Sequence, residues 1–465
     1  MPKTSAKEKA EELTGRMDLL MPEERMRREI VSSAAGIGAF YGFEPIKTAS
    51  AESAILLTPL IRQGLLDERP PVFCKTRAGE EIALSPSGIL GVLRAYASHR
   101  LQALPHPVKM SFEADAFSAG AAAHRARPWI DPIDLYADGS GPSDGSMVLW
   151  REWGLVMVGE ESAVAETEII QALWKACGEL GIGEDEMEAR INATGCVHCR
   201  PHCRSSFSAF FRARRQRLCV KSRRDIAHNP TAILSCADER CVSASAQAPQ
   251  ALDFLCDRCK KHLRSALEFM DEARIPYFLD TRLFREGSWF CETIFVLLLR
   301  SPSGGVSKDR ASESEHADPD SRPLLIAEGG RVSRAAGLFA GKDIAAVGGT
   351  LLLDALRHAL GAKSESVRSG ADVFFVQLGD LAKRKSFEIL EDLREGGIEI
   401  RESLGRDSIK VQFKIAERLA ARYALVLGQK EALDGTIIVR EVQSGIQETV
   451  PQANLVEFLK KKLEK

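Results

Sequence analysis

The chain has 465 residues, of which 45% are hydrophobic and 28% charged, so it can bury large cores and should fold as two or three globular domains. The formal net charge of −2 excludes a protein held to nucleic acid by bulk charge, so any RNA contact must come from local basic patches. Residues 1–16 contain no apolar signal-peptide region, and no later apolar run reaches the roughly 18 residues needed to span a bilayer, which predicts a cytoplasmic protein.

The first part of the chain alternates helical and strand-like patterns. After a charged arm at residues 1–20, apolar spacing predicts a helix over Glu24–Phe40, followed by a strand. Alternating residues on both sides of a Gly turn predict a β-hairpin over Val72–Leu84, which leads into a helix ending near Leu101. A further strand is expected over Val148–Gly159, before an amphipathic helix.

Eight of the eleven cysteines lie between Cys196 and Cys259, and in a reducing compartment such clustering favours a metal over disulfides. Cys196-Val-His-Cys199 and Cys256-Asp-Arg-Cys259 are CxxC turns, each able to present two thiolates to one tetrahedral Zn²⁺. Four further cysteines, Cys203, Cys219, Cys236 and Cys241, lie between the two turns. We therefore predict a structural zinc site at Cys196, Cys199, Cys256 and Cys259, with reduced cysteines that hold no metal as the alternative.

The segment between these turns is basic. Residues 204–224 interleave Phe207, Phe210 and Phe211 with cationic side chains, a pattern suited to phosphate contact and base stacking. The candidate RNA-binding residues here are Arg212, Arg214, Arg215 and Arg217. The alternative is a solvated basic surface.

The last quarter of the chain, Asp372–Lys461, follows a β-α-β-α-β-β-α pattern, which predicts a mixed sheet covered by helices. Its second helix is expected to begin at Asp407 or Ser408 and to continue through Tyr423. Cationic and amide side chains near the start of that helix are candidates for contact with phosphates and bases: Arg406, Lys410, Gln412 and Lys414.

Three segments of this module, at residues 402–412, 425–428 and 447–451, resemble the anticodon-binding domain of class II aminoacyl-tRNA synthetases, most closely the histidyl enzyme. The resemblance extends from about residue 21 to the end. It implies an α+β fold: a class II synthetase-like antiparallel sheet with helices over residues 21–365, a Cys-rich insertion at 187–265, a flexible loop at 301–323, and a C-terminal α/β anticodon-binding-like domain at 371–465. The resemblance also implies tRNA as a partner, and a homodimer or a heterodimer with a synthetase-like subunit.

The positions that handle substrate in this family are altered in the present sequence. Ser87 stands where the family has an acid that receives the amino group of histidine, and Ser118 where an arginine binds the α-phosphate of ATP. Ala355 replaces the arginine that braces the γ-phosphate, and Leu352 replaces a glycine beneath the adenine. Because arginines stabilise the charge that develops on the phosphates, their loss should abolish adenylation.

One pocket arginine is kept. Arg285 aligns with the catalytic arginine of the histidine-specific motif, but Trp289 and Phe290 replace the paired tyrosines that hydrogen-bond the imidazole. A site without these polar partners loses its ability to discriminate histidine.

The sequence therefore favours a catalytically silent histidyl-tRNA synthetase paralogue that binds tRNA or regulates a partner, with a possible Zn²⁺ and without ATP. One alternative is an active histidine–tRNA ligase in which Arg125 or Arg357 supplies a missing guanidinium beside Arg285. Another is a regulatory subunit of histidine biosynthesis, although such subunits generally lack an anticodon-binding domain.

Overall fold

The computed structural model describes residues 18–119, 147–234, 236, 238–300, 322–363 and 372–463. The chain divides into two compact units, residues 1–359 and 360–465. The expected N-terminal arm, except residues 18–20, and nearly all of the expected loop at 301–323 lie outside the described residues, as does Arg125. Within the described residues, no helix is both long and apolar enough to cross a membrane.

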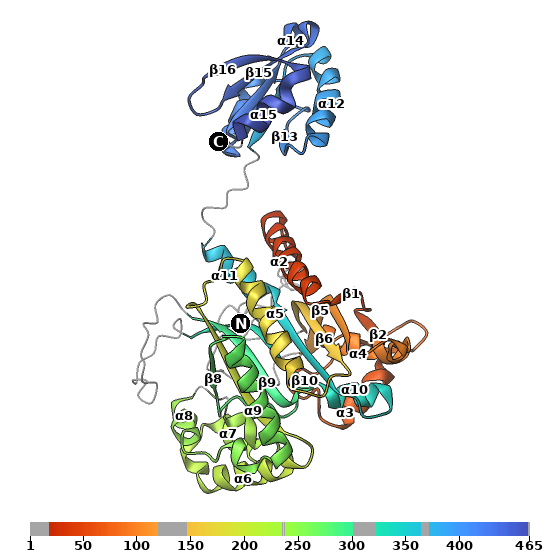
Figure 1. Cartoon of the computed structure of the whole chain (residues 1–465), viewed down its shortest axis with the longest axis vertical. Coiled ribbons are helices and arrows are strands. Elements are labelled where there is room, and N and C mark those ends of the chain that lie inside the picture. The colour runs from red at the N-terminus through yellow and green to blue at the C-terminus, as the bar shows by residue number, and fades with distance from the viewer. Residues whose placement is uncertain are drawn as a thin grey trace, which may run out of the picture. The chain divides into compact units, whose positions relative to one another are not determined.

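The first unit is built on an eight-stranded sheet with the order β1-β5-β6-β11-β10-β9-β7-β8 (Figure 1). Its inner neighbours pair antiparallel, and only the two edge strands β1 and β8 pair parallel with their neighbours. In sheet order the strands are β1 (Glu44–Ile46), β5 (Val108–Ala119), β6 (Met147–Val158), β11 (Ala346–Leu352), β10 (Leu324–Arg331), β9 (Cys291–Leu299), β7 (Met187–Gly195) and β8 (Tyr277–Leu279). The predicted antiparallel sheet is thus confirmed.

Helices pack on both faces of this sheet. A Cβ on Gly348 of β11 would meet Ile89 at 3.1 Å, whereas a Cβ on the next residue, Gly349, would meet Ile169 at 2.8 Å. Because successive strand residues point to opposite faces, α4 and α5 cover opposite faces and approach β11 closely where it has no side chains. The helices around the sheet are α2 (Met21–Phe40), α3 (Thr58–Arg62), α4 (Gly88–Ser98), α5 (Val164–Glu179), α10 (Ser333–Ala340) and α11 (Leu353–Lys363).

Two smaller parts complete the first unit. The predicted hairpin is formed by β3 (Phe73–Lys75) and β4 (Glu81–Leu84), and β2 (Ala51–Ser53) adds a third strand. The Cys-rich insertion is helical, and its shorter helices group into one lobe beside α9 (Figure 1). Its elements are α6 (Cys199–Ala213), η5 (Arg215–Arg217), α7 (Val220–Asp225), η6 (Pro230–Ile233), α8 (Glu239–Ser245), η7 (Ala251–Phe254) and α9 (Asp257–Glu272).

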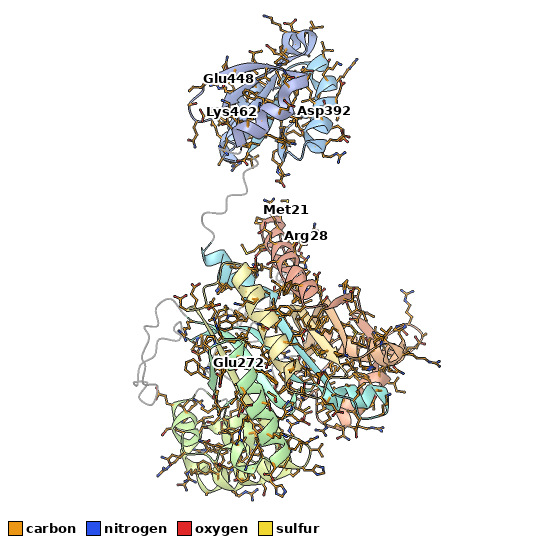
Figure 2. The ribbon with its side chains drawn as sticks, in the orientation of Figure 1. Met21, Arg28, Glu272, Asp392, Glu448 and Lys462 are labelled. Atoms are coloured by element: carbon orange, nitrogen blue, oxygen red, sulfur yellow. The ribbon has the colours of Figure 1, made fainter. Side chains whose placement is uncertain are left out.

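The second unit has a five-stranded mixed sheet with the order β13-β12-β14-β15-β16. Its elements are β12 (Val373–Gln377), α12 (Asp380–Glu395), β13 (Ile400–Glu402), α13 (Ile409–Arg418), β14 (Tyr423–Leu427), α14 (Gln429–Asp434), β15 (Thr436–Glu441), β16 (Gln447–Pro451) and α15 (Leu455–Leu463). Lys462 on α15 forms an ion pair with Glu448 on β16 at 2.8 Å (Figure 2).

The sequence predicted most of these elements, with three errors. The second helix was expected to include Tyr423, but α13 ends at Arg418, and Ala420 has a φ of 53°, so the chain turns there before β14. The expected pattern also lacked the short helix α14 and the last strand β16, which has only one buried residue, Val450. A strand with a single buried side chain carries little of the period-2 hydrophobic signal by which strands are recognised.

Candidate functional site

One face of the large sheet carries Ser118 and Leu352, two of the altered substrate-handling positions, beside further buried side chains. In the strand registers, Glu152 of β6 lies opposite Leu352 of β11 and opposite Ala114 of β5. Ser118 lies four residues after Ala114 on β5 and therefore shares that face, and Glu328 of β10 does so opposite Thr350. The fold thus brings together positions that are more than 200 residues apart in the chain.

Glu152 occupies the centre of this face and is fully buried. Its carboxylate accepts hydrogen bonds from Ser87 Oγ at 3.0 Å, from the Gly88 backbone N–H at 3.0 Å and from Trp150 Nε1 at 2.7 Å. Burial raises the pKa of Glu152, against the opposing charge of Arg69. Ser87 also accepts a bond from the Ile89 N–H, so it N-caps α4 and joins that helix to the sheet.

Arg285, the retained arginine, is paired inside the protein. Its Nη1 lies 2.6 Å from Glu328 Oε2, and Arg69 Nη2 lies 2.7 Å from the other carboxylate oxygen. Arg69 Nη1 also lies 3.9 Å from Glu152. Arg285, Glu328 and Arg69 are 5%, 1% and 8% exposed, so the two guanidiniums share one internal carboxylate away from solvent.

Aromatic rings enclose Arg69. Its guanidinium carbon lies 4.7 Å from the Trp150 ring centroid and 5.4 Å from that of Trp289. Both indoles are buried, and Trp289 Nε1 has no hydrogen-bond partner among the described residues. The arginine therefore fills the space between the two rings, where cation–π attraction supplements its ion pairs.

Ser118, at the position of the missing arginine, supports this arrangement. Its Oγ donates to the Pro70 carbonyl at 3.1 Å, and the Ala119 N–H donates to the same carbonyl at 2.8 Å. On the other side of Arg69, the Glu68 N–H donates to the Gly287 carbonyl at 3.0 Å. The segment that carries Arg69 is thus fixed between the end of β5 and the loop that carries Arg285.

The structure also locates the other altered positions. Ala355 is fully buried near the start of α11, which follows β11 directly. Arg357, proposed as a substitute guanidinium, instead donates to Glu23 on α2 at 2.7 Å. It is therefore committed to a helix contact rather than to Arg285.

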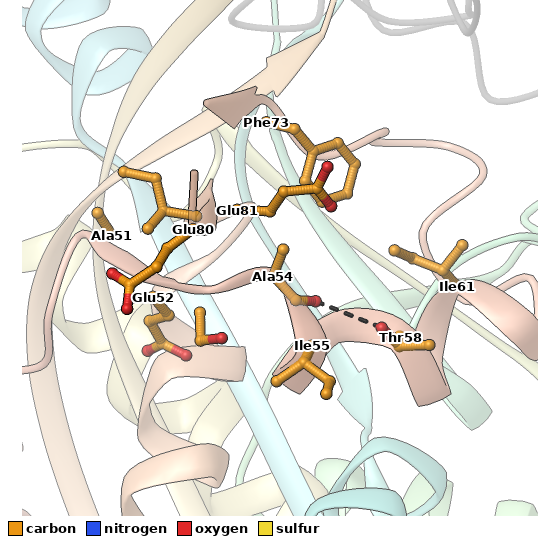
Figure 3. A pocket seen from close by; sticks show the side chains of 11 residues that line it. Ala51, Glu52, Ala54, Ile55, Thr58, Ile61, Phe73, Glu80 and Glu81 are labelled. Atoms are coloured by element: carbon orange, nitrogen blue, oxygen red, sulfur yellow. Dashed lines mark hydrogen bonds between the residues drawn. The ribbon is translucent and has the colours of Figure 1, made fainter. Parts of the chain in front are cut away.

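A separate open hollow lies beside the hairpin (Figure 3). It measures about 810 Å³ and is lined from β2, α3 and the β3–β4 hairpin, with Glu52, Glu80 and Glu81 among its side chains. None of the eleven described residues that line it is Lys or Arg. Glu52 and Glu81 are paired with Arg94 at 2.6 Å and Lys75 at 3.2 Å, so the hollow's own carboxylates already engage these neighbouring cations.

The four cysteines predicted to bind zinc come together. The sulfur atoms of Cys196, Cys199, Cys256 and Cys259 all lie within 4.8 Å of one another. The sulfurs of Cys196 and Cys199 are 3.6 Å apart, and those of Cys199 and Cys259 are 4.0 Å apart. A tetrahedral Zn²⁺ with Zn–S bonds near 2.3 Å places sulfurs about 3.8 Å apart. Although burial would raise it, hydrogen bonds led by those from the backbone of Cys199 and His198 lower the pKa of Cys196 to about 6, which favours the thiolate. The donor set fits a structural zinc.

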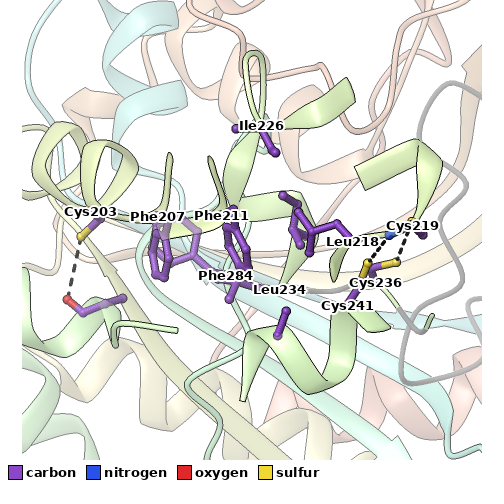
Figure 4. Close-up of a cluster of buried hydrophobic side chains, with 13 residues drawn as sticks. Cys203, Phe207, Phe211, Leu218, Cys219, Ile226, Leu234, Cys236, Cys241 and Phe284 are labelled. Carbon is purple, nitrogen blue, oxygen red and sulfur yellow. Dashed lines mark hydrogen bonds between the residues drawn. The ribbon is translucent and has the colours of Figure 1, made fainter. Parts of the chain in front are cut away.

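In the basic segment of the insertion, the phenylalanines predicted to stack on bases are mostly buried. Phe207 and Phe211 are fully buried in the core of the lobe and stack on each other, so they cannot stack on bases (Figure 4). Phe210 is partly buried beneath Arg214, whose guanidinium lies 3.8 Å from the ring centroid. Arg212, Arg215 and Arg217 are exposed, and their contact with phosphates stays a prediction. Phe207 and Phe211 of α6 thus belong to the core, whereas the exposed arginines lie at the end of α6 and in η5.

In the second unit, Arg406, Lys410 and Lys414 are exposed, but Gln412 is fully buried. Its amide accepts from the Gln377 N–H at 3.0 Å and donates to the carbonyls of Gln377 at 2.9 Å and Arg406 at 2.8 Å. The assignment of Gln412 to nucleic-acid contact is therefore corrected: it ties α13 to β12. Residues two apart on a helix point to different sides, which separates Gln412 from Lys410 and Lys414.

Arg69 and the pairing of Glu328 were not predicted from the sequence. A usable signal was present, because Glu328 is the one charge in the otherwise uncharged run Leu324–Gly330. A charge inside a buried strand requires an opposite charge nearby, although the sequence does not say which one.

Comparison with known proteins adds to this geometry. Residues 372–462 match a family model described as "Anticodon binding domain". A histidine–tRNA ligase from Pelotomaculum thermopropionicum is 27% identical over 456 residues, covering 97% of this chain and 97% of the relative. One from Caldicellulosiruptor bescii is 26% identical over 463 residues, covering 97% and 98%.

Solved structures share the fold. Apo histidyl-tRNA synthetase from S. aureus superposes with a TM-score of 0.69 at 22% identity, covering 98% of this chain and 99% of that chain. A Bacillus halodurans protein titled as an ATP phosphoribosyltransferase regulatory subunit/histidyl-tRNA synthetase gives a TM-score of 0.56 at 13% identity, covering 88% and 96%.

Proposed function

The chain belongs to the histidyl-tRNA synthetase family, and from this premise we propose that it binds tRNA without forming histidyl-adenylate. The observation that carries the proposal is the pairing of Arg285 with Glu328 at 2.6 Å, with Arg69 on the second oxygen of the same buried carboxylate. An internal anion thus holds the cation that a synthetase would direct at the substrate.

Electrostatics supports the loss of ATP chemistry. A triphosphate needs net positive charge at the site, since its own charge grows more concentrated as the adenylate forms. Here two guanidiniums face two carboxylates, Glu152 and Glu328, and Ser118 and Ala355 stand where the family has arginines. Binding ATP would require Arg285 to exchange an established buried partner for a phosphate, with no free energy gained in return.

The filling of the pocket by buried side chains also supports the loss of ATP chemistry. Arg69 lies between Trp150 and Trp289, and Leu352 lies directly opposite Glu152 on the same face. All of these side chains are less than 9% exposed. A bound histidine or adenine would have to displace them. A ligand that binds only the folded chain, present at 100 times its Kd, adds about 2.7 kcal/mol to the free energy of unfolding and so raises the unfolding temperature. We expect no such rise with ATP and Mg²⁺ or with histidine.

The tRNA part of the proposal is supported by two exposed basic surfaces. One comprises Arg212, Arg215 and Arg217 of the insertion, and the other comprises Arg406, Lys410 and Lys414 of the second unit. A chain with a net charge of −2 can bind RNA only through local groups of cationic side chains, and these two surfaces are such groups.

Charge reversal tests this assignment. In a filter-binding assay, the double variant Arg215→Glu, Arg217→Glu should bind tRNA about tenfold or more weakly, with a smaller dependence on salt. The matched control reverses Lys75 and Lys175, two exposed cations elsewhere in the first unit, and changes the net charge equally. Equal losses in both double variants would refute a defined RNA surface.

An active ligase is the second candidate, and one observation favours it. Arg69 places a guanidinium from elsewhere in the chain beside Arg285, joined to it through Glu328. If Arg69 serves as the phosphate-binding cation, the chain should aminoacylate tRNA, and Arg69→Ala should abolish that activity. If the proposal above holds, both proteins are inactive.

The remaining parts of the proposal concern zinc and assembly. We propose that Cys196, Cys199, Cys256 and Cys259 hold a structural Zn²⁺, which would join α6 to α9. We also expect a dimer, because α2 exposes Met21 and Phe40 at 83% and 81% and because the family resemblance implies a homodimer or a heterodimer. Light scattering with size exclusion measures the mass directly.

A further inference from the structure

A second group of cysteines lies at one end of the core of the insertion lobe. The sulfur atoms of Cys219, Cys236 and Cys241 all lie within 4.8 Å of one another, and all three residues are buried (Figure 4). They come from different places: Cys219 N-caps α7, Cys236 follows η6, and Cys241 lies on α8. The fold has therefore gathered thiols from three separate elements at one point.

Ser222 occupies the fourth position around this point. It follows Cys219 by three residues, as the second cysteine of a CxxC turn would, and its side chain is completely buried. Its Oγ lies 3.2 Å from Cys219 Sγ and 3.3 Å from Cys241 Sγ. Thiols are weak hydrogen-bonding partners, so a buried hydroxyl placed between them is poorly compensated unless it has another role.

The distances suit a metal rather than a disulfide. Cys219 Sγ and Cys236 Sγ are 4.0 Å apart, about twice the length of an S–S bond and close to the roughly 3.8 Å expected between thiolates on one tetrahedral Zn²⁺. Backbone N–H groups also point at the sulfurs: Ser222 N–H donates to Cys219 Sγ at 3.3 Å, and Cys219 N–H donates to Cys241 Sγ at 3.4 Å. Such donors stabilise thiolates and orient them.

Burial alone does not explain the grouping. Cys203 belongs to the same core and is fully buried, yet it donates to the Ala251 carbonyl at 3.8 Å and takes no part in the group (Figure 4). Cys177, on α5, is likewise fully buried outside either cysteine group. Burial of a cysteine in this chain therefore does not by itself place its thiol next to other thiols.

We propose that Cys219, Cys236 and Cys241 form a second zinc site, with Ser222 Oγ in the fourth position. The site is separate from the four-cysteine group and does not rest on the proposed loss of adenylation. It differs chemically from that group, because its ligands are three sulfurs and one oxygen. We therefore expect it to bind soft metals with lower affinity than the four-cysteine group.

The site has a structural consequence for the basic surface. Arg215 and Arg217 form η5 immediately before Cys219, and the metal would join α7 and α8 beneath this segment. The lobe is small, and in small domains a metal contributes folding energy that the core cannot supply. Removing the metal should therefore loosen the arginine-bearing segment and make it sensitive to trypsin.

Metal content of the purified full chain tests the proposal. We expect two zinc ions per chain by elemental mass spectrometry, one in Cys236→Ala, and two in the matched control Cys203→Ala, which removes a buried thiol from the same core. A zinc content that is the same in Cys236→Ala as in the wild type, whether one or two ions, would overturn the second site.

A second measurement does not depend on the stability of the Cys236 variant. Cadmium NMR of the wild-type chain loaded with Cd²⁺ should give two resonances, one typical of four sulfurs and one displaced toward a mixed sulfur–oxygen set. Ser222→Cys should move the displaced resonance into the four-sulfur range. A single resonance in the wild type, or an unchanged pair in Ser222→Cys, would contradict the assignment of Ser222.

Discussion

Replacing Glu328 by glutamine tests whether this carboxylate is the internal counter-ion of the pocket. The change preserves size and leaves no cavity, so its effect is mainly electrostatic. Glu328 is 1% exposed and lies 2.6 Å from Arg285 and 2.7 Å from Arg69, and loss of one partner from a buried pair costs about 3–5 kcal/mol. Because two cations lose the same partner, we expect a decrease in the free energy of unfolding near the upper end of that range.

Urea unfolding followed by tryptophan fluorescence measures this loss. All five tryptophans precede residue 290, so the signal reports the first unit alone. The control is Glu184→Gln, which removes an exposed ion pair with Lys175 at 3.2 Å and should cost less than about 1 kcal/mol. If Glu328→Gln destabilises no more than this control, the two guanidiniums do not depend on Glu328 and our reasoning about the pocket is wrong.

Two further predictions concern buried polar residues away from the pocket. Burial alone would raise the pKa of Glu166, but hydrogen bonds and charges from His262 and Arg331 together lower it below its usual 4.5, so its stabilising contribution is complete above that pH and is lost as the pH falls through the lowered value. The stability difference between wild type and Glu166→Gln should therefore shrink in acid, and a difference that stays constant down to pH 3 would contradict this. Gln412→Ala should cost about 2–4 kcal/mol, because it leaves buried backbone groups of Gln377 without partners. Faster hydrogen exchange in β12 with unchanged tRNA affinity checks the second prediction, and a large loss of affinity with normal exchange would restore Gln412 as an RNA contact.

Part of this structure followed from the sequence because its signals are local. The two CxxC turns predicted the four-cysteine group, since a turn fixes two thiolates and needs only one partner turn. The strand-to-helix steps were also recognisable, including the one from β11 into α11 that carries Ala355.

The wrong assignments to RNA contact concern residues whose role depends on whether they face the core or the solvent. Phe207 and Phe211 were assigned to stacking, and Gln412 to base contact, because their neighbours are cationic, yet each lies on the buried side of its helix. Helical periodicity relative to the buried side would have separated them from the exposed arginines and lysines.

Long-range pairing was beyond the sequence. Arg69 is more than 200 residues from both Arg285 and Glu328, and nothing local indicates that a side chain beside two prolines enters the pocket. The counter-ion of a buried acid is defined by strand order and register, which only the folded chain reveals.

Histidine-dependent ATP–pyrophosphate exchange tests the central claim most directly, because it measures adenylate formation without tRNA. An active histidyl-tRNA synthetase assayed in parallel is the positive control. The Arg69→Ala variant shows whether any exchange depends on Arg69. Our account predicts no exchange above background for either the wild-type chain or the variant. Exchange by the wild-type chain that disappears in Arg69→Ala would contradict it and would identify Arg69 as the catalytic cation of a working ligase.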